Sequence, residues 1–237
     1  MATLGEMSTG VAHELNQPLS VIKTAGGFLH KKVLKGEDID DETMKTLTGE
    51  INVQVDRASK IINHMREFGR KSDVVSEKVQ LNEALERALG IFRQQLKLRE
   101  IEVVMDLQPD LPSVMADSNR LEQVFINLLI NARDAIEAKW GGNVEQKAKA
   151  KKIFLKTHAK NGRAVVEIAD TGTGIPPGII DKIFEPFFTT KQVGKGTGLG
   201  LTISYGIIQD YDGVIRVKSR EEEGSRFIIE FPVSSEN

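Results

Sequence analysis

Apolar residues recur every three or four positions in the first part of this chain, which is the pattern of one buried stripe on a helix. A first run covers residues 4–33 and a second covers residues 44–68. Gly36 and the acidic residues that follow it, between the two runs, are typical of a helix end and a new helix start. The sequence therefore predicts a hairpin of two long helices. The stripes consist of Leu4, Met7, Val11, Leu15, Leu19, Ile22, Leu29 and Val33, and of Met44, Leu47, Ile51, Val55, Ala58, Ile62, Met65 and Phe68.

His13 occupies the opposite side of the first predicted helix. It lies between Val11 and Leu15, and at about 100° per residue a helix that buries both of them exposes His13. Glu14 follows directly and supplies a carboxylate able to orient the imidazole and accept its proton, which leaves the other ring nitrogen as a nucleophile. The simpler interpretation is an ordinary exposed histidine. The adjoining glutamate, with Pro18 five residues on, favours a chemical role.

Two helices joined by a short turn leave an apolar seam that is too broad for one partner helix to cover. A second copy of the hairpin would cover it in a four-helix bundle, so the sequence predicts a homodimer through residues 1–72. The alternatives are a bundle formed within one chain and a hairpin packed on the domain that follows.

A polar connector at residues 73–78 precedes a segment, 79–237, in which strand and helix patterns are mixed. The mixture predicts an α/β sandwich with helices on one face of a sheet, so the fold class is α plus α/β. The predicted strands are 79–81, 101–107, 153–158, 164–169, 214–218 and 226–231; the predicted helices are 82–98, 119–139 and 199–209, with a turn at 109–112, a loop at 140–152 and irregular chain at 170–198.

Composition narrows the classes of partner. The net charge of −2 over 237 residues gives no reason to expect nucleic acid or an anionic membrane surface. The absence of cysteine excludes disulfides and thiolate chemistry and fits a reducing cytoplasm. We find no apolar run long enough to cross a membrane and no signal-peptide pattern. We therefore expect a cytoplasmic protein without membrane contact, which opens on a functional helix as the cytosolic part of a longer sensor would.

Two amides stand four residues apart in the predicted helix 119–139. Asn127 and Asn131 share one face of that helix, where their oxygens are able to bind a hard cation such as Mg²⁺. The alternative is a pair of asparagines that only bond to each other.

Asp170 follows an apolar strand in Asp170-Thr171-Gly172-Thr173-Gly174. An ionised carboxylate only accepts hydrogen bonds, so it suits an exocyclic amine such as that of adenine. Gly172 and Gly174 allow the backbone to approach a flat base without a Cβ clash. An Asp-Gly turn accounts for the local conformation equally well.

An aromatic anchor and a run of alternate glycines follow. Phe184-Glu185-Pro186-Phe187-Phe188-Thr189-Thr190-Lys191 is succeeded by Gly194-Lys195-Gly196-Thr197-Gly198-Leu199-Gly200-Leu201. Glycines before a helix leave backbone amides free to bind phosphate oxygens, and Lys191 and Lys195 add positive charge. The run matches neither the Walker A loop nor the dinucleotide fingerprint, and a flexible loop has a similar composition.

Taken in order, these motifs resemble those of bacterial sensor histidine kinases of two-component signalling. His13-Glu14-Leu15-Asn16-Gln17-Pro18-Leu19 resembles the H box, residues 127–131 the N box and residues 170–174 the G1 box of that family. Residues 184–188 resemble the F box and residues 196–201 the G2 box, so the likeness spans nearly the whole chain. Together with Thr189-Thr190-Lys191, the H and F boxes are closest to the nitrogen and oxygen sensor kinases.

The resemblance implies a dimeric phosphotransfer hairpin joined to a GHKL or Bergerat-type ATP-binding domain. It implies that His13 accepts the phosphoryl group of ATP with Glu14 as the base, and that a response-regulator receiver domain is the partner. It further implies that Asn127 and Asn131 hold Mg²⁺, that Lys191 neutralises charge, and that residues 188–198 form a lid. The implied ATP-binding residues are Asn127, Asn131, Asp170, Gly172, Gly174, Thr190, Gly196, Thr197, Gly198, Leu199 and Gly200.

Two departures from the family pattern bear on activity. ATP-hydrolysing relatives carry a glutamate at the position of Asn127, and an amide cannot act as that base, so we expect slow hydrolysis. Gln17 stands where many members carry Asn or Thr, which puts phosphatase activity in doubt. The competing hypotheses are an ATPase-driven clamp and a non-catalytic scaffold that binds nucleotide structurally.

Overall fold

A computed structural model describes residues 4–69, 76–141, 151–191, 196 and 198–234 of the chain. For residues 4–11, 13, 14, 60 and 63–69 it describes the backbone alone. The chain divides into two compact units. One unit consists of Met1–Arg70 with Glu185–Leu199, and the other of Lys71–Phe184 with Gly200–Asn237.

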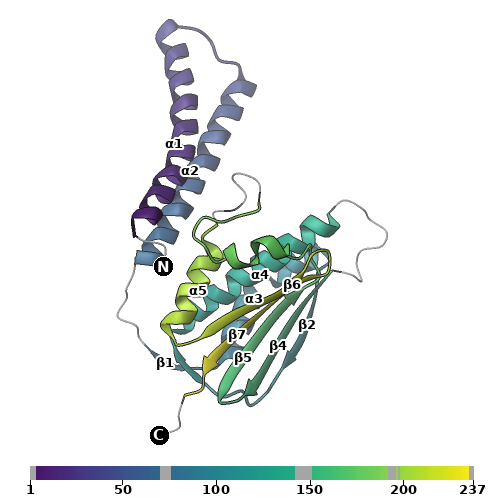
Figure 1. Cartoon of the computed structure of the whole chain (residues 1–237). Helices are drawn as coiled ribbons and strands as arrows, with labels where there is room; N and C mark the ends of the chain where they lie inside the picture. Colours follow the sequence, from purple (N-terminus) through teal and green to yellow (C-terminus); the bar gives the residue numbers. More distant parts are fainter. Residues whose placement is uncertain (1–3, 70–75, 142–150, 192–195, 197, 235–237) are drawn as a thin grey trace. The chain divides into compact units, whose positions relative to one another are not determined.

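The predicted hairpin is confirmed. Helix α1 spans Leu4–Lys35 without interruption at Pro18, and α2 spans Asp41–Gly69 (Figure 1). The two helices pack along each other within this unit. Large apolar side chains nevertheless remain exposed on both of them, among them Leu19, Phe28, Val33, Leu34, Met44, Val53, Val55 and Ile62.

The turn between the helices has the features that the sequence predicts. Gly36 adopts a left-handed conformation with φ of 63°, and its N–H donates to the carbonyl of Val33 at 3.1 Å. Glycine reaches this conformation at little cost, which is why it ends helices. The Asp40 carboxylate then accepts the N–H of Thr43 at 2.8 Å and caps the start of α2.

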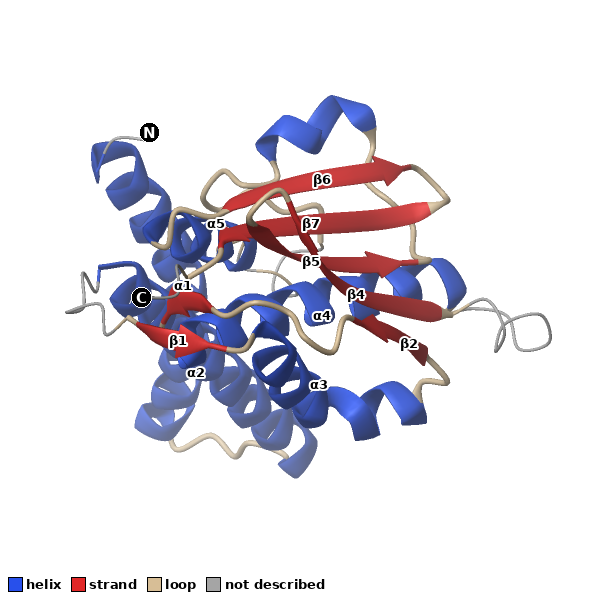
Figure 2. Cartoon of the chain, turned by 90° about the horizontal axis from the view of Figure 1, so that it is seen from below, coloured by secondary structure: helices blue, strands red, loops and turns tan. Residues whose placement is uncertain are grey.

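A five-stranded mixed sheet forms the frame of the second unit. Its strand order is β2-β4-β5-β7-β6, with β2 parallel to β4 and the other neighbours antiparallel (Figure 2). A separate ribbon pairs β1 (Glu77–Val79) with β3 (Val114–Ala116). The strands of the main sheet are β2 (Glu102–Leu107), β4 (Lys152–Lys160), β5 (Arg163–Asp170), β6 (Val214–Arg220) and β7 (Gly224–Pro232).

One face of this sheet is covered and the other is open. Along β4, Ile153 and Leu155 are buried while Phe154 and Lys156 are exposed, so alternate side chains face opposite environments. Helices α3 (Leu81–Leu98), α4 (Ser118–Trp140) and α5 (Gly200–Asp210) supply the buried layer. The predicted α/β sandwich with helices on one face is therefore confirmed.

Helix α4 is fixed at its N-terminal end. Asp117 caps its start by accepting the N–H groups of Asn119 and Arg120. The Arg120 guanidinium also pairs with Asp210 at 2.6 Å and lies 5.4 Å from the centre of the Tyr211 ring. These contacts hold α4 against the end of α5 and thereby set the direction of the asparagine face.

Several short or irregular elements differ from the prediction. The first strand ends at Val79, so the expected strand 79–81 is wrong and Leu81 already opens α3. The ribbon strand β3 and a short 3₁₀ helix at Pro177–Lys182 were not predicted, because three to six residues carry too little periodicity. Trp140 belongs to α4 rather than to the expected loop, of which residues 142–150 lie outside the described chain.

Candidate functional site

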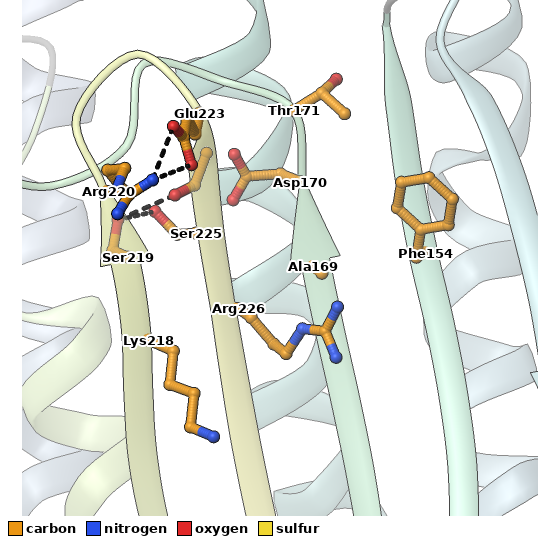
Figure 3. A pocket seen from close by; sticks show the side chains of 11 residues that line it. Phe154, Ala169, Asp170, Thr171, Lys218, Ser219, Arg220, Glu223, Ser225 and Arg226 are labelled. Carbon is orange, nitrogen blue, oxygen red and sulfur yellow. Dashed lines mark hydrogen bonds and ion pairs between the residues drawn. The ribbon is translucent and has the colours of Figure 1, made fainter.

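Asp170 ends β5 at the centre of the sheet and is buried, with 8% of its surface exposed. Its Oδ1 accepts the N–H of Gly172 at 2.8 Å, and the backbone N–H of Ser225 on β7 also donates to the carboxylate. Figure 3 shows the side chain projecting toward the strand that carries Ser225. A carboxylate is thus held at the strand end that the sequence singled out.

The pKa of Asp170 is set by opposing effects. Burial, the largest of them, raises this pKa to about 6, while the N–H groups of Gly172 and Ser225 and the charge of Lys139 act to lower it. Asp170 is therefore ionised at neutral pH and only accepts hydrogen bonds. Such a group suits an amino group of a ligand and repels a carbonyl oxygen.

The two glycines after Asp170 are required by close contacts with the protein itself. A Cβ on Gly172 would lie 2.5 Å from the Cβ of Ala135 on α4. Gly174 has a φ of 69°, and a Cβ there would lie 2.0 Å from the carbonyl oxygen of Arg220. Glycine is therefore required at both positions because this loop packs tightly between α4 and the β6–β7 turn.

The predicted amide pair lies on α4. The Asn127 Nδ2 atom donates to the Gly200 carbonyl at 3.2 Å and to the Ser204 hydroxyl at 3.3 Å. Since a carbonyl oxygen only accepts, this contact identifies the nitrogen of the amide, and the two bonds do not use its Oδ1. Asn131 follows one turn later and is partly exposed.

The donor set fits a hard cation that arrives with its own oxygen ligands. Within residues 4–69, 76–141, 151–191, 196 and 198–234, no cluster of three His, Cys, Asp or Glu residues forms a metal cage. The amide oxygens of Asn127 and Asn131 offer two neutral ligands on one helical face. Mg²⁺ commonly combines a few protein oxygens with waters and phosphate oxygens, which matches such an incomplete set.

Helix α5 begins at Gly200, directly beside Asn127. The first N–H groups of a helix have no partner within the helix and attract anions. Its first turn is anchored because the Thr202 hydroxyl donates to the Phe184 carbonyl at 3.1 Å. The Phe184 ring lies 5.5 Å from the ring of Tyr205 further along α5.

The glycine-rich segment before α5 belongs to the other compact unit, Met1–Arg70 with Glu185–Leu199. Gly198 and Phe187 both have positive φ values, 66° and 65°, and a Cβ on Gly198 would lie 2.3 Å from the carbonyl carbon of Phe187. A Cβ on Gly196 would lie 2.8 Å from the Thr189 hydroxyl. Of the predicted residues here, Thr190 is exposed, Lys191 is partly exposed, Leu199 is buried, and Thr197, like the neighbouring Lys195, lies outside the described residues.

His13 and Glu14 lie within α1, as predicted, but their side chains lie outside the described residues. One helical turn later, the Oε1 atom of Gln17 accepts a hydrogen bond from the Arg57 guanidinium of α2 at 3.0 Å. The amide at this position is therefore held by the second helix of the hairpin.

Several contributors to the site were not singled out from the sequence. Ser225 supplies a donor to Asp170, and Ser204 fixes the Asn127 amide. Gly224, with φ of 109°, allows β7 to approach so closely that a Cβ would lie 2.0 Å from the Asp170 carbonyl. The sequence holds a weak signal for Gly224, a glycine between an acidic turn and a strand, but not its register with Asp170.

A shallow cavity of about 430 Å³ adjoins Asp170 on the open face of the sheet. Phe154, Lys218 and Arg226 line it, and the Arg220–Glu223 ion pair at 3.0 Å closes one end (Figure 3). The amides of α4 do not line this cavity. Only the Asp170 end of the cavity therefore belongs to the site described above.

A buried acceptor at a strand end, two amides on the covering helix and the adjoining start of α5 define a nucleotide-binding α/β sandwich. Comparison with known families agrees. Residues 116–235 match the histidine kinase-, DNA gyrase B- and HSP90-like ATPase family, and residues 3–73 match the His Kinase A (phospho-acceptor) domain. The chain belongs to the sensor histidine kinase family, whose catalytic core combines these two domains.

Individual relatives support this assignment. The chain is 33% identical to the two-component sensor PprA of Pseudomonas aeruginosa over 99% of its own length and 25% of that protein. It is 31% identical to the sensor histidine kinase ZraS of Escherichia coli K12, over 99% of this chain and 46% of ZraS. It therefore spans about a quarter to a half of the length of these curated relatives.

A solved structure covers both units. Histidine kinase ThkA in complex with the response regulator protein TrrA matches 98% of this chain and 62% of the solved chain, with a TM-score of 0.70 and 28% identity. Separately, no helix among the described residues is long and apolar enough to cross a bilayer.

Gly174→Ala is expected to destabilise the sheet unit by about 2 kcal/mol or more, because the substitution combines a positive φ with a backbone clash. Gly178→Ala, four residues on, is the matched control, since a Cβ there meets nothing within 4 Å. Urea unfolding of both variants measures the difference. Equal stability of the two variants would contradict the packing described for Gly174.

Asp170→Asn is expected to raise stability at pH 7 by on the order of 1 kcal/mol while ATP binding is lost. The raised pKa means that the native state loses stability as pH rises from about 4 to about 6, because an ionised carboxylate must remain buried. Asparagine removes this cost and one good acceptor. Thermal unfolding at pH 4 and pH 7 should show that the variant is more stable than wild type at pH 7 only. An equal gain in stability at both pH values would refute the ionisation of Asp170 as its cause.

Proposed function

We propose that this chain is the catalytic core of an ATP-dependent protein histidine kinase that phosphorylates His13 and passes the phosphoryl group to an aspartate of a response regulator. The observation that carries the proposal is the combination, in one chain, of a phospho-acceptor domain match around His13 and a buried acceptor for an amino group at Asp170. Neither feature alone distinguishes a kinase from a nucleotide-binding scaffold.

Adenine recognition is assigned to Asp170. Its carboxylate would accept the exocyclic amine of the base, and the packing of Gly172 and Gly174 keeps the neighbouring loop in place. The two N–H groups that already donate to the carboxylate stabilise its charged form, so the acceptor remains available at neutral pH.

Asn127 and Asn131 would hold Mg²⁺ through their amide oxygens, and that ion would neutralise charge on the phosphates. The first N–H groups of α5, from Gly200, would bind phosphate oxygens. Residues 188–198, among them Thr190, Lys191, Gly196, Thr197 and Gly198, would form a lid over the phosphates, and Leu199 would complete the nucleotide-binding residues. The ammonium of Lys191 would neutralise charge on the phosphates.

In the first transfer, one imidazole nitrogen of His13 forms a bond to the γ-phosphorus as the bond from that phosphorus to the oxygen of ADP breaks. Glu14 accepts the proton from the other ring nitrogen, which keeps the attacking nitrogen nucleophilic. In the second transfer, a carboxylate oxygen of the partner displaces His13 from phosphorus. An amide at position 127 accepts no proton from water, so futile hydrolysis of ATP is slow.

The partner and the assembly follow from the same family. ThkA forms a complex with a response regulator protein, which supports a receiver domain as the acceptor for this chain. The exposed apolar side chains on α1 and α2, such as Val33 and Leu34 at 71% and 73% exposure, favour a homodimer in which a second hairpin covers them. Residues 1–72 would form this phosphotransfer domain, 73–78 the linker and 79–237 the ATP-binding domain of a cytoplasmic kinase core.

Incubation with γ-labelled ATP and Mg²⁺ tests the proposal directly. The wild-type chain should gain label that survives base and is lost in acid, as a phosphorus–nitrogen bond requires. His13→Gln should lower incorporation by at least about 100-fold. His30→Gln is the matched control, since His30 is an exposed histidine of the same helix, and it should label normally. Unchanged labelling of His13→Gln would refute the assignment of His13 as the phosphoacceptor.

A further inference from the structure

The last residue of α4 contacts the loop that follows Asp170. The indole Nε1 of Trp140 donates to the carbonyl oxygen of Thr171 at 3.1 Å, and the side chain is partly buried. The same loop is bound a second time to α4, where the Thr173 N–H donates to the carbonyl of Ala135 at 3.2 Å. Helix α4 thus holds the loop at two points, directly beyond the acceptor.

The preceding residue, Lys139, joins a third element. Its ammonium donates to the carbonyl oxygen of Glu222 in the β6–β7 turn and lies 5.0 Å from the centre of the Trp140 ring. The N–H of Glu222 in turn donates to the Thr173 carbonyl at 2.7 Å. Helix end, loop and turn therefore form one closed set of hydrogen bonds around the chain that leaves Asp170.

The charges near Asp170 differ in how they are balanced. Most of the cations on the surrounding strands have an anionic partner, whereas the described contacts of the Lys139 ammonium are a neutral carbonyl oxygen and an aromatic ring. The balanced pairs are Lys152 with Glu102 at 2.9 Å, Arg220 with Glu223 at 3.0 Å and Arg226 with Glu167 at 2.9 Å. The other charged residues nearby are Lys218, on the open face of β6, and Glu221 and Glu222, in the β6–β7 turn.

We propose that Trp140 and Lys139 are positioning residues for adenine recognition: Trp140 fixes the loop beside Asp170, and Lys139 supplies the positive charge that favours the accepting form of Asp170. Neither residue needs to touch the nucleotide. The inference rests on the proposed function, because it assigns a role toward the base that Asp170 would bind. It adds the end of α4 to a helix that already carries Asn127 and Asn131.

The electrostatics of Asp170 agree with this assignment. Burial raises the pKa of this carboxyl, and the charge of Lys139 is one of the effects that lower it. Without Lys139, the carboxyl would gain its proton at a higher pH and lose its accepting form earlier on acidification. The two residues should consequently affect ATP binding in different ways.

The test is the ATP dissociation constant, measured by calorimetry between about pH 5 and pH 8. The affinity of wild type for ATP should fall on acidification, and this acid limb of the profile should have its midpoint near the pKa of Asp170. Lys139→Met should move that limb toward higher pH, because the charge that favours the ionised form of Asp170 is removed. Lys139→Arg, which keeps the charge, should restore the wild-type profile. Trp140→Phe should weaken binding about fivefold at every pH without moving the limb, as loss of one hydrogen bond predicts.

Lys160→Met is the matched control. Lys160 is an exposed lysine of the same sheet, seven residues along β4 from Ile153, the register partner of Asp170. These seven residues separate Lys160 from Ile153 by about 23 Å along the strand, which exceeds two Debye screening lengths at physiological salt. The Lys160→Met variant should therefore bind ATP as wild type does. Thermal unfolding of each variant, without nucleotide, separates an effect on binding from a loss of folded protein.

The outcomes are distinguishable. Wild type that fails to bind ATP at any pH overturns the proposed function. Wild type that binds ATP, with a Lys139→Met limb coincident with that of Lys160→Met, overturns the role of Lys139. Folded Trp140→Phe with unchanged affinity overturns the role of Trp140.

Discussion

Burial of an ionised carboxylate at the end of the central strand is the constraint on which the ATP-binding unit depends. Taking Asp170 out of water raises its pKa to about 6, and the backbone N–H groups directed at it, with the charge of Lys139, oppose that rise and favour the charged form. One donor comes from its own loop at Gly172 and another from Ser225 on the adjacent strand. A shift of β7 by one residue would remove the second donor and turn the strand over.

The glycines around Asp170 follow from that constraint. Chain segments must approach the carboxylate closely enough to donate to it, and a Cβ on Gly224 would meet the Asp170 carbonyl at 2.0 Å. Helix α4 performs two tasks along its length. Its middle turns Asn127 toward the start of α5, while its last turn holds the loop after Asp170 through Trp140. A rigid helix of this length thereby couples the proposed phosphate and adenine ends of one site.

Local patterns in the sequence were sufficient to predict the helix α1 and the strand end that carry the proposed chemistry. Periodicity alone predicts α1 and places His13 opposite the apolar stripe, and Asp170 is recognisable as an acid after an apolar strand. Contacts between distant segments were not predictable in this way. Ser225 reaches Asp170 only through the β5–β7 register, and Lys139 meets Glu222 across 83 residues of chain. Such partners depend on tertiary packing, for which neither periodicity nor turn composition gives a signal.

The most direct test of the account compares the affinity of the chain for ATP and for inosine triphosphate at pH 7.5. The two nucleotides share their phosphates and ribose, but inosine replaces the exocyclic amine by a carbonyl oxygen. An ionised Asp170 that accepts from the amine should reject this oxygen, so ATP should bind at least about 100-fold more tightly. Equal affinity for the two nucleotides would contradict the assignment of Asp170 as the group that recognises adenine.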